Sequence, residues 1–444
     1  MTMSAVAAAF AAAMGTFAPF ENAPRLAVAV SGGADSLSLC FLARDWTAAR
    51  CGRVTALIVD HRLRPDSGEE GRQVAACMAR HGIDHKILSW LGEKPATGLQ
   101  EAARVARYRL LCGWCRDNAV LHLLLGHHAD DQAETVLYRL IRGSGADGLA
   151  GISAIVDSAQ VRLLRPLLGC RAADIRRFLR SDGEVWVDDP SNQDARFVRT
   201  HLRAMRASLE AAGLCQPVIL AAAARMAAAK TAMQASVVAL LARCCRVHPM
   251  GFARLDRAVM AAAPVEIGAK AFTRIVMMIG GSNRECGADA ARRMYERLFG
   301  GENRTNASLG RCLLVGDRPD VLVCRERRHL PPPRFLHSDE EILWDGRFRL
   351  KAMRLKERAA GPWHVRALQQ EDWRMIRAHS ATLAQQGTPT LVQSTLPILC
   401  DEGGLVSAPH FAFLRDDVTA MHAMVAKVCW SPRNGVTGAG YFLL

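Results

Sequence analysis

The chain has 444 residues, half of them apolar and 23% charged, which is typical of a globular protein with two or three domains and excludes a mainly disordered chain. Its basic residues exceed its acidic residues by 14, and fifty of the 57 basic residues are Arg. Because Arg is suited to bidentate contacts with phosphate, this surplus favours a polyanionic partner such as nucleic acid.

The sequence predicts neither a membrane span, nor a secretory signal, nor a disulfide framework. No apolar run reaches the roughly 20 uncharged residues that cross a bilayer, and no basic residue precedes Arg25 at the apolar N-terminus. The 14 Cys are dilute and show no paired spacing, with Cys112 and Cys115 forming a lone C-x-x-C. We therefore expect a protein of the reducing cytoplasm whose Cys side chains mostly pack in the core.

Short apolar runs alternate with longer helical patterns over the first 150 residues. The predicted strands are residues 25–30, 54–59, 85–88 and 121–125, and the predicted helices are residues 37–44, 69–80, 99–117 and 130–142. This alternation predicts an α/β fold, a doubly wound parallel sheet with helices on both faces. In such sheets ligands bind beside the carboxyl ends of the strands.

The next part of the chain differs in composition. Residues 162–206 are dense in Arg, and residues 214–300 are rich in Ala and predicted to be mainly helical. A predicted pair of strands at 312–315 and 321–324 follows them. The Pro-Pro-Pro sequence at 331–333 then forms a stiff linker, because Pro continues neither a helix nor a sheet interior.

Beyond the linker, short predicted strands lie at 347–350, 396–399 and 441–444. Pro397 limits the second of these to the edge of a sheet. The sequence thus predicts three domains: an α/β domain over 1–206, a mainly helical connector over 207–330 and a small α+β domain over 334–444.

The strongest local signal is an S-G-G-A-D-S motif directly after the first predicted strand. It consists of Ser31, Gly32, Gly33, Ala34, Asp35 and Ser36. The two Gly allow a sharp turn, and the N–H groups and hydroxyls that follow lie at a helix N-terminus, which favours phosphate. The G-x-x-x-x-G-K-[ST] of a P-loop and the G-x-G-x-x-G of a dinucleotide fold are both absent from the motif. An ordinary Gly turn is the weaker alternative, because the motif lies directly between the predicted strand and the predicted helix.

This arrangement resembles the PP-loop ATP pyrophosphatases, which cleave ATP to AMP and pyrophosphate while they adenylate a substrate oxygen. The runs V-D-H at 59–61 and G-H-H-A-D-D-Q-A-E-T at 126–135 strengthen the resemblance. It implies that the S-G-G-A-D-S motif holds ATP and that Asp35 holds Mg²⁺ against the phosphates.

The second run, residues 126–135, also contains His and acidic side chains that could bind a ligand. Asp131 and Glu134 begin a predicted helix three residues apart, so both carboxylates share a face and could hold an ammonium group and accept its proton. Together with His127 and His128 they are also ligand types for zinc, although neither H-E-x-x-H nor a thiolate cluster accompanies them. Acids that only stabilise a helix N-terminus are a third alternative.

Six further segments resemble one PP-loop subfamily, the tRNA(Ile)-lysidine synthetases. They are E-A-A-R-V-A-R-Y at 101–108, R-G-S-G at 142–145, G-L-A-G at 148–151, R-P-L-L at 165–168, W-V-D-D-P-S-N at 186–192 and R-T-H-L-R at 199–203. In the last, Thr200 stands where Asn is expected. The resemblance covers residues 24–206 with specific motifs, and beyond them it is one of architecture only.

The resemblance implies a ligase that joins free L-lysine to C2 of the wobble cytidine of an isoleucine tRNA with a CAU anticodon. ATP adenylates the cytosine O2 with loss of pyrophosphate, and the lysine amine then displaces AMP. The product, lysidine, changes codon reading from AUG to AUA.

The resemblance also implies residue roles. Arg107 would steady the α-phosphate, with Arg104 as the alternative, and Asp131 and Glu134 would bind and deprotonate lysine. The C-terminal domain would contact the tRNA backbone together with a set of basic side chains, Arg196, Arg199 and Arg203.

Three alternatives remain. A PP-loop tRNA 2-thiocytidine synthetase needs an iron–sulfur cluster, for which Cys112, Cys115 and Cys215 could be ligands, but the first two lie in an apolar helical stretch after the basic helix rather than before it. A small-molecule PP-loop ligase explains the loop but not the basic connector. A non-enzymatic tRNA-binding protein should have lost at least one of the site residues. The oligomeric state stays open, a homodimer included.

Overall fold

The computed structural model describes residues 4–63, 67–95, 97–158, 161–181, 186, 202, 205–282, 286–301, 306–317, 319–337, 340–352, 363–379, 388–415 and 426–435. The chain divides into two compact units, and each is described by itself. Unit 1 extends to Ala232, and unit 2 begins at Met233. The division into three domains stays a prediction.

Unit 1 is built on a mostly parallel sheet with the strand order β3-β2-β1-β4-β6-β5. The strands are β1 (Arg25–Val30), β2 (Arg53–Asp60), β3 (Asp84–Ser89), β4 (His122–Leu124), β5 (Ile155–Asp157) and β6 (Arg162–Leu164). All pairs are parallel except β5 with β6. The chain runs from β1 outward to β3 and then returns to β4 on the other side of β1. This reversal places a topological switch point between β1 and β4, where ligands bind in such folds.

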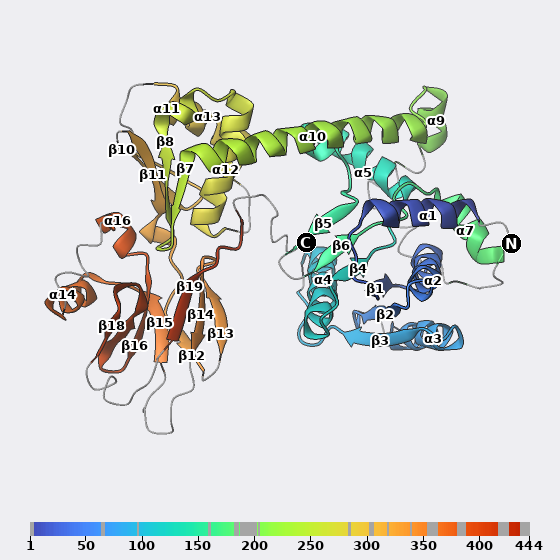
Figure 1. Cartoon of the computed structure of the whole chain (residues 1–444), viewed down its shortest axis with the longest axis horizontal. Coiled ribbons are helices and arrows are strands. Elements are labelled where there is room, and N and C mark those ends of the chain that lie inside the picture. Colours follow the sequence, from blue (N-terminus) through green and yellow to red (C-terminus); the bar gives the residue numbers. More distant parts are fainter. Residues whose placement is uncertain are drawn as a thin grey trace. The chain divides into compact units, whose positions relative to one another are not determined.

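Helices cover both faces of this sheet, as predicted (Figure 1). The helices that pack on it are α1 (Ala5–Thr16), α2 (Ala34–Ala48), α3 (Ser67–Arg80), α4 (Leu99–Asp117) and α7 (Ala172–Ser181). Unit 1 also contains α5 (Ala129–Ile141), α6 (Ala146–Leu149) and α9 (Arg206–Ala211). In β1, Leu26 and Val28 join the core formed with α1, α2, α3 and α7, whereas Ala27 packs with Tyr108 and Leu111 of α4. Because side chains alternate along a strand, the nearly all-apolar sequence of β1 buries both of its faces.

The long helix α10 (Gln216–Cys244) contains the boundary between the units. Unit 2 continues with an antiparallel sheet in the order β7-β8-β11-β10-β9. Its elements are β7 (Cys245–His248), β8 (Phe252–Asp256), α11 (Arg257–Ala261), α12 (Val265–Gly280), α13 (Ala288–Phe299), β9 (Ala307–Leu309), β10 (Cys312–Asp317) and β11 (Asp320–Arg325). Phe272 and Ile275 of α12 pack on this sheet. No helix in the described ranges is long and apolar enough to cross a bilayer.

The predicted strand pair at 312–315 and 321–324 is confirmed as β10 and β11. The helical prediction over 214–300 is wrong at 245–256, where β7 and β8 form a hairpin. Gly251 closes its turn with a φ of 75°. The hairpin exists because β8 pairs with β11, a partner more than sixty residues away that local periodicity does not reveal.

The last part of unit 2 contains two more sheets, in the orders β12-β15-β16-β17-β18 and β13-β14-β19. Their elements are β12 (Arg334–Leu336), β13 (Glu341–Trp344), β14 (Phe348–Ala352), β15 (Trp363–Ala367), α14 (Gln370–His379), α16 (Thr390–Gln393), β16 (Pro397–Asp401), β17 (Gly404–Ala408), β18 (Phe413–Leu414) and β19 (Ala426–Trp430). The strand predicted at 347–350 is confirmed as β14, and the one predicted at 441–444 lies outside the described residues.

The prediction that Pro397 limits its strand to a sheet edge is wrong, because β16 lies between β15 and β17. Pro397 is the first residue of β16 and pairs with Ala367, the last residue of β15. Pro is tolerated as the first residue of a strand, since the N–H it lacks interrupts no bond in the middle of the ladder.

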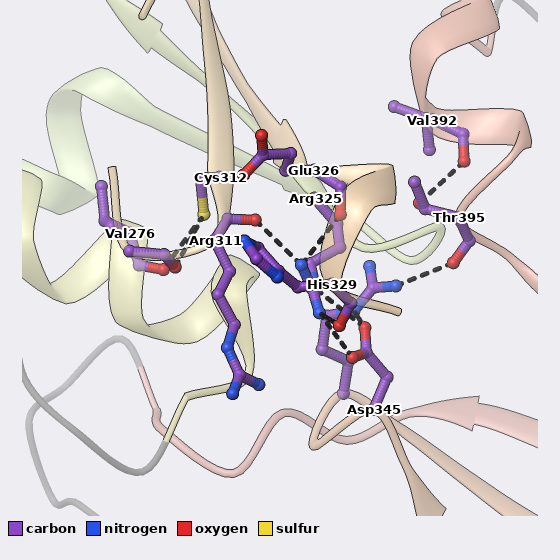
Figure 2. A network of polar contacts seen from close by, with 11 residues as sticks. Val276, Arg311, Cys312, Arg325, Glu326, His329, Asp345, Val392 and Thr395 are labelled. Atoms are coloured by element: carbon purple, nitrogen blue, oxygen red, sulfur yellow. Dashed lines mark hydrogen bonds and ion pairs between the residues drawn. The ribbon is translucent and has the colours of Figure 1, made fainter. Parts of the chain in front are cut away.

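A buried ionic network joins three segments of unit 2 (Figure 2). Asp345, between β13 and β14, accepts hydrogen bonds from Nε and Nη2 of Arg325 at 3.0 and 2.9 Å and from Nε of Arg347 at 2.6 Å. Arg347 also donates to the carbonyl of Thr395 at 2.7 Å. The three charged side chains are at most 2% exposed. The network therefore ties the end of β11 to the β13–β14 turn and to the segment before β16.

Candidate active site

The S-G-G-A-D-S loop connects the end of β1 to the start of α2. Gly32 has a left-handed φ of 87°, and Gly33 is the N-cap of α2 without a side-chain capping bond. The hydroxyl of Ser36 accepts from the N–H of Ser31 at 3.1 Å and donates to the carbonyl of Gly33 at 3.0 Å. The loop thus closes on itself and leaves the first N–H groups of α2 available to an anion.

The loop after β4 packs directly on the S-G-G-A-D-S loop. A Cβ added to Gly126 would lie 3.4 Å from backbone atoms of Asp35 and Ser36. Two residues later, Nε2 of His128 is 3.5 Å from Oδ2 of Asp35. Burial lowers the pKa of His128, but hydrogen bonding to Asp35 and the charges of three carboxylates outweigh it, so the pKa is raised. His128 therefore links the start of α5 to the start of α2.

Helix α5 begins with a capping box. Oδ2 of Asp131 accepts from the N–H of His128 at 3.1 Å, and the N–H of Asp131 donates to Nδ1 of His128 at 3.4 Å. The neighbouring Asp130 accepts from the N–H of Ala172 at 2.9 Å. The alternative that these acids stabilise a helix N-terminus is therefore correct in part, because Asp131 caps α5 whatever else it binds.

Glu134 lines a pocket between α5, α9 and α10 that is open to solvent. Its apolar lining residues are Ala133, Leu137, Leu202, Leu209, Leu214 and Ile219, and its polar ones are Asp130, Glu134, Glu210 and Gln216. Asp131 lies at the capping box and is not a lining residue. An apolar wall with carboxylates suits a ligand that has an aliphatic chain and a cationic end.

Three Arg side chains converge on His127. Arg165, which follows β6, is 4% exposed and donates from Nε to Nδ1 of His127 at 3.3 Å. Arg104 and Arg107 of α4 lie 5.3 and 5.4 Å from the ring centre of Tyr108. Burial, followed by the charges of Arg165, Arg107 and Arg104, lowers the pKa of His127 to about 3. The immediate surroundings of His127 are therefore electropositive.

The described residues include no group of three or more His, Cys, Asp or Glu side chains that could hold a metal ion by themselves. Zinc as the alternative for His127, His128, Asp131 and Glu134 thus has no structural support. Oδ1 of Asp35 is buried without a hydrogen-bond partner. A single carboxylate with an open oxygen fits Mg²⁺, which is typically held by one or two carboxylates together with substrate phosphates.

The C-x-x-C lies on α4, where Cys115 is buried and Cys112 half-buried. Burial raises the pKa of Cys112 to about 11 and that of Cys115 to about 12. Both are protonated thiols that pack in the core, as predicted, rather than thiolates ready to bind a metal.

Comparison with known proteins agrees with this geometry. Residues 5–207 match the family model of a PP-loop domain that binds ATP. Over 402 residues the chain is 35% identical to the tRNA(Ile)-lysidine synthase of Ruegeria pomeroyi, an alignment that covers 87% of this chain and 88% of that one. The chain belongs to the tRNA(Ile)-lysidine synthase family. As a member it is an ATP-dependent ligase of tRNA modification.

Other tRNA(Ile)-lysidine synthases match over different lengths. The one from Orientia tsutsugamushi is 26% identical over 90% of this chain and 92% of its own. The one from Bradyrhizobium sp. is 46% identical over 199 residues, which are 44% of this chain and 56% of that one. Among solved structures, the U34-tRNA thiolase NcsA from Methanococcus maripaludis, with its [4Fe-4S] cluster, is 18% identical over 50% of this chain and 78% of that chain, at a TM-score of 0.44.

In this lysidine synthase family member, the structure brings most of the predicted site residues to one edge of the sheet. Asp35 and Asp131 are linked through His128, and Arg107 reaches the same edge from α4, where it contributes after burial to a lowered pKa of His61. Glu134 faces the neighbouring pocket. The roles of these residues stay predictions. The predicted tRNA contacts lie outside the described residues: Arg196, Arg199 and Arg203.

Arg165 belongs to the R-P-L-L segment at 165–168, but the motifs of the sequence assign it no role. An Arg directly after a strand of a parallel sheet would have been a signal, because the carboxyl ends of such strands meet at the site. The contact of Arg165 with His127 arises because β6 is the neighbour of β4 in the sheet.

Proposed function

We propose that this chain carries out both steps of lysidine formation at one composite site, on an isoleucine tRNA with a CAU anticodon. O2 of the wobble cytidine attacks the α-phosphorus of ATP, and pyrophosphate leaves. The ε-amino nitrogen of lysine then bonds to C2 and loses a proton, while the C2–O2 bond breaks and AMP leaves.

The observation that carries the proposal is that α5 connects the two halves of the site. Its N-cap residue, His128, contacts Asp35 of the S-G-G-A-D-S loop. Glu134, six residues or about 9 Å further along the helix axis, lines the pocket that suits an aliphatic ammonium. A nucleotide on the loop and a lysine in the pocket would therefore be neighbours.

On the nucleotide side, the S-G-G-A-D-S loop would bind the triphosphate of ATP. Asp35 would hold Mg²⁺, which offsets the negative charge of the departing pyrophosphate. Arg107 would contact the α-phosphate, with Arg104 as the alternative. Neither Arg forms an ion pair with a carboxylate among the described residues, which supports a phosphate as their partner.

On the lysine side, Glu134 would bind the ε-ammonium group and accept its proton as the carbon–nitrogen bond forms, because the amine is a nucleophile only after it loses that proton. The apolar wall of the pocket would hold the four methylene groups. Asp131 would add negative charge nearby, although one of its oxygens already accepts from the His128 N–H.

The surplus of 14 basic residues supports a role of Arg196, Arg199, Arg203 and unit 2 in holding the tRNA backbone. A homodimer is part of the same proposal, and sedimentation of the full chain with and without tRNA tests it.

The deciding experiment is ATP-dependent incorporation of labelled lysine into a CAU-anticodon isoleucine tRNA, with the wobble C→U transcript as the substrate control. D35N should abolish pyrophosphate release. E134Q should raise the KM for lysine about tenfold or more, since a hydrogen bond to a charged group contributes about 1.5–3 kcal/mol, with ATP affinity unchanged. E69Q, at an exposed pair with Arg72 on α3, is the matched control. Sulfur incorporation in place of lysine, or an unchanged lysine KM in E134Q, would contradict the proposal.

A further inference from the structure

The contact between Arg165 and His127 specifies where the hydrogen of the imidazole lies. Nε of Arg always carries a hydrogen, so Nδ1 of His127 must be the acceptor of the 3.3 Å bond. In a neutral imidazole the single hydrogen is then on Nε2. Arg165 is itself held in place, because Nη1 donates to the carbonyl of Ser153 at 2.8 Å and its backbone N–H donates to the carbonyl of Ala154 at 2.9 Å.

The groups around His127 keep it neutral. The charged and titratable groups that face it are Arg165 after β6, Arg104 and Arg107 on α4, and the adjacent His128. All of them act with burial to lower the pKa of His127 to about 3. A group with so low a pKa is a weak base at neutral pH and carries no positive charge there. The neutral imidazole of His127 can therefore act only as a hydrogen-bond donor, through its Nε2–H. This N–H has no protein partner among the described residues.

The surroundings indicate an anionic acceptor for this N–H. Arg165, which is 4% exposed, and the half-buried Arg107 form no ion pair with a carboxylate within the described part of the chain, and a buried charge is normally paired. The preceding residue, Gly126, lies against the backbone of Asp35 and Ser36. The group with the required charge next to that loop is a phosphate of the bound nucleotide.

We propose that Arg165 is a positioning residue that holds His127 as the neutral Nε2–H tautomer, so that His127 donates a hydrogen bond to a phosphate oxygen of the nucleotide. The nucleotide comes from the proposed function, whereas the tautomer does not depend on it. A neutral donor of this kind stabilises developing negative charge without a change in its own protonation.

The first test measures the tautomer in the whole chain labelled with ¹⁵N-His, with the His127 signals assigned by their loss in H127Q. We expect an unprotonated Nδ1 and a protonated Nε2, unchanged between pH 8 and pH 5. In R165M both tautomers should be populated. A His127 that carries its hydrogen on Nδ1, or that titrates near its ordinary pKa in the native protein, would overturn the proposal.

The second test is a double-mutant cycle on kcat for pyrophosphate release with saturating ATP and tRNA. R165M should lower kcat about tenfold to a hundredfold, as is typical when the partner that orients a functional His is lost. In H127Q the amide keeps an N–H close to the Nε2 position and has no tautomers, so R165M should add less than a twofold loss there.

R162M is the matched control, because Arg162 at the start of β6 donates to the carbonyl of Phe17 and not to His127. It should leave kcat unchanged. An equal loss from R165M in both backgrounds would show a purely structural role. If lysine incorporation itself failed in the native protein, the proposed function would fall while the tautomer measurement still stood.

Discussion

Gly32 offers a direct test of how the S-G-G-A-D-S loop binds ATP. Its φ of 87° lies in the left-handed region, and a Cβ at this position would be 2.7 Å from Cγ2 of Val74 on α3. For G32A the backbone strain is about 1–2 kcal/mol and the overpacking about 1–3 kcal/mol. The free protein relieves this strain by distorting the loop, and ATP must then restore the turn. We therefore expect the Kd for ATP to rise at least about 30-fold, which corresponds to about 2 kcal/mol.

Calorimetric titration with ATP measures the effect, and V74A separates the two causes. The double variant G32A/V74A lacks the clash but keeps the strained φ, so its Kd should fall between that of G32A and that of the native protein. V74A alone should bind ATP almost normally, because Val74 only packs behind the loop. Native affinity in G32A, or a double variant that binds no more tightly than G32A, would show that the turn at Gly32 does not control ATP binding in this way.

Two further predictions concern the stability of unit 2. D345N leaves the buried guanidinium groups of Arg325 and Arg347 without a carboxylate and should lower the free energy of urea unfolding by about 3–5 kcal/mol. E266Q, which breaks an exposed pair with Arg292, should cost far less, and equal losses would contradict the role of burial. Burial, followed by the charges of Arg347 and His248, lowers the pKa of His410 to about 4. The unfolded chain binds this proton below about pH 6.5 and the folded chain does not, so stability should fall by up to about 3 kcal/mol between pH 6.5 and pH 4. H410Q should reduce this slope in unfolding experiments across that range, and an undiminished slope would contradict the assignment.

The elements of unit 1 were predictable because their signals are local. The strands β1 and β2 are apolar runs, which must be buried on both faces, and α4 shows its helical pattern over the whole predicted range. The S-G-G-A-D-S motif was equally clear, since a turn with two Gly between a strand and a helix is specified by neighbouring residues. Family membership followed from such motifs, all of them in the first half of the chain.

Long-range pairing is what local signals miss. The hairpin of β7 and β8 depends on β11, and the central position of β16 depends on strands from both of its sides. In each case the residues that decide the structure are distant in sequence, so periodicity and propensity give a helix or an edge strand instead.

The class of fold in unit 1, the ATP-binding loop and the candidate acids on α5 follow from local sequence, because each depends on residues within one turn or one element. The contacts that those groups make depend on how distant parts of the chain pack together. This packing directed Asp131 toward the His128 N–H and Glu134 toward the pocket, although they are three residues apart on one helix. It also brought Arg165 to His127 across 38 residues, because the parallel strands β4 and β6 are neighbours and end at the same edge of the sheet.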